Sequence, residues 1–123
     1  MTVTAYTLAV VLDLFIVFIG ARFLLRPRPS AAGYGVPAEP GGDAGAYLTV
    51  KGLRDGTLGV LGLALLVFVG ARAEAWFMLC AAVIPLVDTL IVLRHGGTKA
   101  VAFGVHFATA VVVLVSAGLL FAV

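Results

Sequence analysis

Residues 4–25 read TAYTLAVVLDLFIVFIGARFLL, an apolar run whose only ionisable side chains besides a tyrosine are Asp13 and Arg22. A helix needs about 20 mostly apolar residues to cross the hydrocarbon core of a bilayer. This stretch is long enough. No Lys or Arg precedes Arg22, so the stretch lacks the basic start of a secretory signal. We therefore expect a retained membrane-spanning helix.

Three further stretches have a similar length and composition: residues 47–70, 73–93 and 99–122. The last three spans are joined by short connections that contain glycine, which suits tight turns after a helix. Short turns place consecutive helices side by side in antiparallel order. The predicted fold is all-α: a polytopic membrane protein in which residues 1–123 form one antiparallel bundle of four transmembrane helices.

The composition excludes several classes of protein. Of the 123 residues, 63% are hydrophobic and 11% are charged, and the mean hydropathy is +1.19. A soluble domain has about 25% charged residues, so a water-exposed globule is excluded. The net charge of +2 is too small for a nucleic-acid-binding surface. Cys80 has no partner for an internal disulfide, and no His or Cys pair has ligand spacing, so we expect no metal site.

The connection between the first two spans, residues 26–46, is long and contains four of the five prolines. Proline removes a backbone donor, so this segment cannot be helical throughout. Loops of this length are often flexible, and others act as lids over active sites. Both interpretations stay open from the sequence. Residues 34–37, Tyr-Gly-Val-Pro, are the part that we expect to be ordered.

Basic residues are distributed unevenly between the two ends of the predicted spans. One side would hold only Arg72, and the other holds the rest: Arg22, Arg26, Arg28, Lys51, Arg54, Arg94 and Lys99. Lys and Arg accumulate on the cytoplasmic side of membrane proteins. The sequence thus predicts a protein of the plasma (inner) membrane with residues 26–46 in the cytoplasm and both termini outside. Glu74 and Trp76 would then lie at the outer interface.

Small residues predict how the helices pack. Gly52, Gly56 and Gly59 share a face of the second span and would let another backbone approach closely, including that of a second copy. A small and polar stripe in the fourth span is expected to face the interior: Ala102, His106, Thr109, Ala110, Val113 and Ala117. Pro85 should bend the third span.

Ionisable side chains inside the spans carry the functional hypothesis, because each costs about 2.5–3.5 kcal/mol to insert. Asp55, Asp88 and His106 come from three different spans and lie at similar depth, roughly 9–12 Å from the cytoplasmic boundary at about 1.5 Å per residue. Asp13 lies deeper. Lys51 shares a helix face with Asp55. These positions predict an acid–base–cation cluster at the mouth of an apolar cavity.

Such a cluster suits general acid–base chemistry. Asp88 is the candidate acid, Asp55 held by Arg54 is the candidate base, and His106 could shuttle the proton. The candidate substrate-binding groups are Asp13, Lys51, Arg22 and Tyr34. The expected reaction is that of an isomerase, a cyclase or an epoxide-type hydrolase acting on a lipophilic small molecule. No nucleotide, flavin or haem motif is visible, and we expect no cofactor. A haem ligated by His106 is the alternative, resting on a single histidine.

The same residues also have a structural interpretation. Asp55 could form an ion pair with Lys51 or Arg54, and His106 could be a neutral hydrogen-bond donor between helices. The protein would then be a non-catalytic binder or carrier of a lipid or quinone, or a small structural subunit of a membrane complex. Fully paired side chains without a cavity would favour the structural subunit.

Three blocks of sequence also carry a family resemblance: Tyr34-Gly35-Val36-Pro37, Lys51-Gly52-Leu53-Arg54-Asp55, and Asp88 before Arg94-His95-Gly96, together with His106. In these blocks the chain resembles a family of small bacterial and fungal four-helix membrane proteins labelled as a domain of unknown function, distantly DoxX-like in architecture. The resemblance covers most of the chain. It implies the four-helix fold and a joint role for these polar positions, and it brings no established activity.

Overall fold

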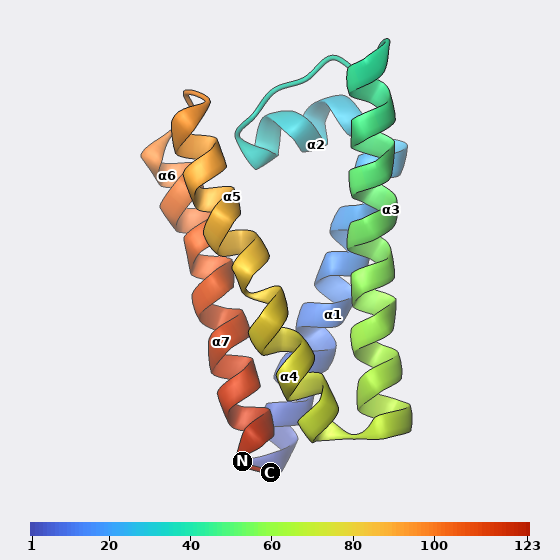
Figure 1. Cartoon of the computed structure of the whole chain (residues 1–123), viewed down its shortest axis with the longest axis vertical. Coiled ribbons are helices and arrows are strands. Elements are labelled where there is room, and N and C mark those ends of the chain that lie inside the picture. Colours follow the sequence, from blue (N-terminus) through green and yellow to red (C-terminus); the bar gives the residue numbers. More distant parts are fainter.

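The structure, a computed structural model, describes all 123 residues and contains helices but no strands. Four helical segments are long and apolar enough to cross a membrane: Thr2–Leu25, Asp43–Val69, Ala71–Arg94 and Lys99–Phe121. The chain runs up and down through them, and both termini lie at the same end of the bundle (Figure 1). The predicted fold class is confirmed.

Most of the spans contain an interruption. The first is the single helix α1 (Thr2–Leu25). The second joins α3 (Asp43–Ala64) to the π-helix η1 (Leu65–Val69). The third consists of α4 (Ala71–Ala81) and α5 (Val83–Arg94). The fourth runs through α6 (Lys99–Val101), the π-helix η2 (Ala102–Phe107) and α7 (Ala108–Phe121).

The third span is interrupted near Pro85. The break between α4 and α5 falls at Ala82, three residues before Pro85. Proline has no N–H to bond the carbonyl one turn earlier, which interrupts the helix at this point. The hydroxyl of Thr89 donates to the carbonyl of Pro85 at 2.8 Å. The bend expected at Pro85 stays a prediction.

Glycines bring α1 and α3 into close contact. A Cβ on Gly20 would lie 2.6 Å from the carbonyl oxygen of Gly52, and a Cβ on Gly52 would lie 2.8 Å from that of Gly20. Small residues allow such backbone contact between membrane helices. Gly52 and Gly59 of this face therefore lie against α1 of the same chain, whereas a Cβ on Gly56 would meet nothing within 4 Å. The packing of α1 takes up most of the face through which a second copy was expected to bind.

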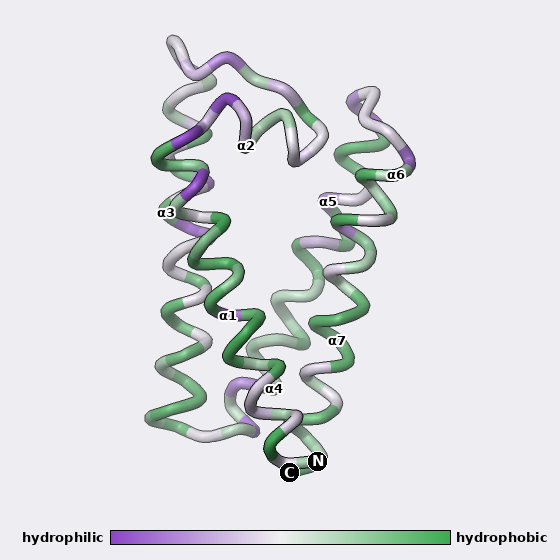
Figure 2. The backbone as a smooth tube through the Cα atoms, turned by 180° about the vertical axis from the view of Figure 1, so that it is seen from behind, coloured by the Kyte–Doolittle hydropathy of each residue, from purple (hydrophilic) through white to green (hydrophobic).

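The bundle consists of two helix pairs that meet at one end and diverge toward the other. One pair is α1 with α3, and the other is α4–α5 with η2–α7 (Figures 1 and 2). At the end with the termini, Ala5 and Ala9 of α1 pack in one buried cluster with Ala75 of α4 and Ala117 of α7. We call this the closed end. The diverging helices leave space at the other end.

A short helix covers the diverging end. α2 (Pro27–Tyr34) lies across the gap between the two pairs (Figure 1). Pro27 occupies its first position, where the missing N–H would have no helical partner in any case. The helix ends at Gly35, whose φ of 103° suits glycine. The segment 26–46 is thus helical in part, in agreement with the expectation that it is not helical throughout, and Tyr34 lies in its helical part.

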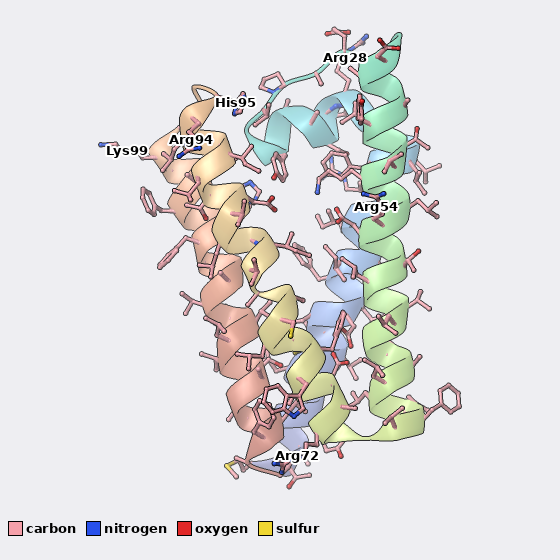
Figure 3. The ribbon with its side chains drawn as sticks, viewed as in Figure 1. Arg28, Arg54, Arg72, Arg94, His95 and Lys99 are labelled. Atoms are coloured by element: carbon pink, nitrogen blue, oxygen red, sulfur yellow. The ribbon has the colours of Figure 1, made fainter.

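Charge differs between the two ends, as the sequence indicates. Arg28, Arg94, His95 and Lys99 lie at the end that carries α2, whereas Arg72 lies at the closed end (Figure 3). The tube coloured by hydropathy shows the same concentration of hydrophilic residues around α2 (Figure 2). The intervening surface is apolar, as expected for helices in contact with lipid.

Candidate functional site

A cavity of about 300 Å³ lies between the two helix pairs and under α2. Its deeper part is lined mainly by apolar side chains from α1, α4 and α7: Leu12, Ile16, Phe77, Met78 and Val113. Polar side chains gather on its walls toward α2: Arg22, Tyr34, Lys51, Asp55, Asp88 and His106. An apolar chamber with a few convergent polar groups is the usual form of a small-molecule site.

The cavity adjoins an opening on the side of the bundle. This opening lies between α3 and α5 and shares Lys51, Asp55, Leu58 and Ile84 with the cavity lining. Arg54 forms part of its rim together with Tyr47 and Val50. In a membrane this side of the molecule would face lipid. The cavity and this opening are therefore neighbours that share one wall.

Lys51 ties Asp55 to two aromatic rings. Its ammonium lies 2.9 Å from Oδ2 of Asp55, which is one turn along α3. The same nitrogen lies 4.9 Å from the centre of the Phe23 ring and 4.8 Å from the centre of the Tyr34 ring. Contacts of a cation with aromatic faces contribute about 0.5–2 kcal/mol each. The ammonium is thus fixed between the carboxylate and the rings.

Arg54 does not take the role that was expected of it. Consecutive residues on a helix are about 100° apart, so Arg54 and Asp55 point to different sides of α3. Arg54 is exposed at the side opening, and Asp55 is buried and paired with Lys51. The expectation that Arg54 holds Asp55 was therefore wrong, and Lys51 fills that position.

Tyr34 and His106 connect this pair to Asp88. Nε2 of His106 donates to the backbone carbonyl of Tyr34 at 2.6 Å, and the two rings lie 4.4 Å apart at 61°. The other ring nitrogen, Nδ1, lies 4.0 Å from Oδ2 of Asp88. Tyr34, Lys51, Asp55, Asp88 and His106 thus form a continuous series of contacts across the cavity. We call these five residues the polar cluster.

The hydrogen bond to the carbonyl of Tyr34 determines which tautomer a neutral His106 adopts. Because Nε2 carries the donated hydrogen, a neutral imidazole presents the lone pair of Nδ1 toward Asp88. Nδ1 of His106 and the carboxyl group of Asp88 face each other across 4.0 Å on the wall of the cavity.

The phenol of Tyr34 remains a proton donor. Burial raises the pKa of Tyr34 above its usual range, and the nearby carboxylates of Asp88 and Asp55 raise this pKa further. Burial disfavours the phenolate because a charged group loses its hydration, and the carboxylates disfavour it because like charges repel. Tyr34 can therefore donate a hydrogen bond to a ligand or to Asp88, and it cannot serve as a base.

The state of Tyr34 can be tested by ultraviolet titration of the three tyrosines. Tyr34→Phe is expected to leave the phenolate signal unchanged up to the highest pH at which the protein stays folded, because Tyr34 stays protonated. The matched control is Tyr47→Phe, which removes a phenol whose residue is 75% exposed and should lower the signal. A clear loss of signal in Tyr34→Phe would contradict the buried environment described for this residue.

A protein-family model described as domain of unknown function (DUF4267) matches residues 14–120. The chain belongs to this family. The match covers α2, the whole of the polar cluster and most of all four spans. No curated protein and no solved structure matches the chain. The family description assigns no activity, and the likeness to DoxX-like proteins stays an expectation.

Two other candidate residues of this family member lie outside the polar cluster. Arg22 lines the cavity but forms no ion pair. Asp13 lies at the apolar, deeper side of the cavity and faces Glu74. Glu74, in the first turn of α4, is fully buried, at 0% exposure, so its side chain faces the interior of the bundle. Asp13 and Glu74 therefore form a second acidic position that sequence reasoning missed.

Three further features of the site were not anticipated. Phe23 supports the ammonium of Lys51 from α1. Ser30 of α2 lines the cavity with a buried hydroxyl that has no hydrogen-bond partner. His106 lies within the π-helix η2, where the extra residue per turn changes the direction of the side chains that follow. Single π-helical turns inside α-helices often occur at functional sites. The sequence alone does not show where such a turn forms, so this indication of a site at His106 was missing.

Proposed function

We propose that the cavity takes up a lipophilic small molecule from the bilayer and that Asp88, His106 and Tyr34 carry out general acid–base chemistry on it. The observation that carries this proposal is the arrangement of the polar cluster on the wall of an apolar cavity of about 300 Å³. Ligand sites typically measure about 300–1,000 Å³ and have few, well-placed polar groups. The adjoining side opening supplies the route from lipid.

The roles follow from the contacts. Asp88, with His106 beside it, donates a proton to an oxygen or an alkene of the substrate and recovers a proton in a later step. The phenol of Tyr34 orients the substrate oxygen by a hydrogen bond. The ammonium of Lys51 stabilises negative charge that develops nearby, and Asp55 holds this ammonium in place. Isomerisation, cyclisation and epoxide opening each can begin with such a proton transfer.

Two observations favour a small-molecule site over a purely structural role. The structural interpretation requires fully paired polar side chains without a cavity, whereas Arg22 lines a cavity and makes no ion pair. It also requires a free glycine face for assembly, and α1 covers most of that face. A binder without catalysis would use the same cavity, and it differs from an enzyme in leaving its ligand chemically unchanged.

The proposal includes an orientation in the plasma (inner) membrane. The end with α2 carries Arg28, Arg94 and Lys99, and the closed end carries Arg72 (Figure 3). Under the positive-inside rule the polar cluster would lie toward the cytoplasm and both termini outside. The proton exchanged during the reaction would then come from the cytoplasmic side.

Native mass spectrometry of gently purified protein tests the proposal. We expect wild-type protein to carry a hydrophobic molecule and Ile84→Trp to lose most of it, because Ile84 lines both the cavity and the side opening. The matched control is Val83→Trp, since this neighbouring residue is 57% exposed and lines neither. Equal amounts of bound molecule in both variants, or none in wild type, would rule out this cavity as the binding site.

A further inference from the structure

A second acidic position lies apart from the polar cluster, between α1 and α4. Asp13 of α1 is 3% exposed and Glu74 of α4 is 0% exposed. Their carboxyl groups lie within hydrogen-bonding reach of each other. Oδ2 of Asp13 and both carboxyl oxygens of Glu74 have no donor from any other group. We call these two residues the acidic pair.

The surrounding helices leave room for the acidic pair. A Cβ on Gly62 of α3 would lie 2.6 Å from Cγ and 2.8 Å from Oδ2 of Asp13, so the carboxyl group fills the space that a side chain would otherwise occupy. Asp13 also lines the cavity. The acidic pair is thus enclosed by protein on most sides and borders the cavity on one side, which gives a proton a way in and out.

No cation compensates the acidic pair. The part of α3 that packs here, residues 56–64, contains no ionisable side chain, and neither η1 nor α7 contains one. On α1, Tyr6 is 39% exposed, and Arg22 is nine residues away, about 13 Å along the helix axis. On α4, Arg72 is only two residues from Glu74 and therefore faces another direction. It is exposed at the closed end (Figure 3).

Two carboxylates in contact repel each other, and a site with little water does not screen that repulsion. Pairs of this kind in proteins are stable when they share one proton, which forms a hydrogen bond between the two groups. We propose that Asp13 and Glu74 form a proton-binding site within the membrane that holds one exchangeable proton at neutral pH. Loss of this proton places two negative charges between α1 and α4 and weakens their contact at the closed end.

The sign of the pH effect follows from this geometry. The folded protein binds a proton that the unfolded chain, with separated and hydrated carboxylates, does not bind at neutral pH. Stability is therefore highest while the pair keeps its proton and falls as the pH rises and the proton leaves. Glu74→Gln replaces the protonated partner by a neutral donor of the same shape. This variant should keep the hydrogen bond to Asp13 and lose the dependence on pH.

Thermal unfolding of the full chain in detergent, followed between pH 6 and 9, tests the proposal. We expect the unfolding midpoint of wild type to fall by roughly 4 °C or more over this range and that of Glu74→Gln to stay level. The matched control is Glu39→Gln, which removes an exposed carboxylate at the other end of the molecule and should behave as wild type. In infrared spectra, the part of the carboxylic-acid C=O band that comes from the acidic pair should disappear in Glu74→Gln and persist in Glu39→Gln.

Two results would overturn the proposal. The first is a Glu74→Gln protein that retains both the pH dependence of wild type and its carboxylic-acid band. The second is a wild-type protein whose stability at alkaline pH is restored by sodium chloride but not by the same concentration of choline chloride, which would assign the site to a metal cation. Should Glu74→Gln fail to fold, Asp13→Asn gives the same neutral hydrogen bond and takes its place in both measurements.

Discussion

Replacing Asp88 with asparagine is expected to lower turnover by about 10²–10⁴-fold while the bundle stays folded. Asparagine has nearly the same shape as aspartate, so the packing of α5 is preserved. It cannot donate a proton as a carboxylic acid at this position does, 4.0 Å from Nδ1 of His106. The bond from Nε2 of His106 to the carbonyl of Tyr34 does not involve Asp88 and should persist.

The measurement uses the hydrophobic molecule that co-purifies with the protein. Wild type should carry a mixture of substrate and product, and Asp88→Asn should carry only the unreacted form. Asp43→Asn is the matched control, because Asp43 is exposed in the first turn of α3 and does not line the cavity. If Asp88→Asn carries the same mixture as wild type, Asp88 has no part in the chemistry. If it unfolds, the residue is structural.

Gly20→Leu is expected to destabilise the bundle by about 3 kcal/mol or more, the upper end of the usual cost of overpacking. Its side chain would have to enter the space taken by the backbone of α3, since a Cβ there would already lie 2.6 Å from the carbonyl oxygen of Gly52 and 2.8 Å from Cα of Gly56. A flexible side chain could move aside, but backbone atoms cannot move without separating α1 from α3.

Circular dichroism during heating, in one detergent and at one pH, measures this loss of stability. The matched control is Gly118→Leu, because a Cβ on Gly118 meets nothing within 4 Å. This change should be neutral or slightly stabilising, since leucine favours the helix more than glycine does. Equal midpoints for the two variants would show that α1 and α3 do not pack through Gly20 in the membrane protein.

Sequence patterns predicted the spans well, because each span satisfies a local requirement for length and apolarity. The same local reasoning placed Lys51 and Asp55 on one face of α3. For residues 26–46 it established only that the segment is not helical throughout, and it did not locate α2. Pro27 stands at the first position of α2, where proline is compatible with a helix.

The contacts between segments were out of reach of the sequence. Tyr34 and His106 are 72 residues apart and meet because α2 folds back across the gap between the helix pairs. Glu74 was placed at the outer interface, together with Trp76, from the distribution of Lys and Arg between the two ends of the spans. That reasoning concerns position along the membrane normal and does not tell which face of α4 turns toward α1. This face decides the burial of Glu74.

The side opening between α3 and α5 has a consequence for how affinity is measured. A lipophilic ligand partitions into the membrane before it meets the protein, so its concentration there exceeds that in water by its partition coefficient. Occupancy then follows the mole fraction of ligand in the lipid phase. Adding detergent or empty vesicles at constant total ligand should dilute that phase and release the ligand, although no residue of the protein has changed.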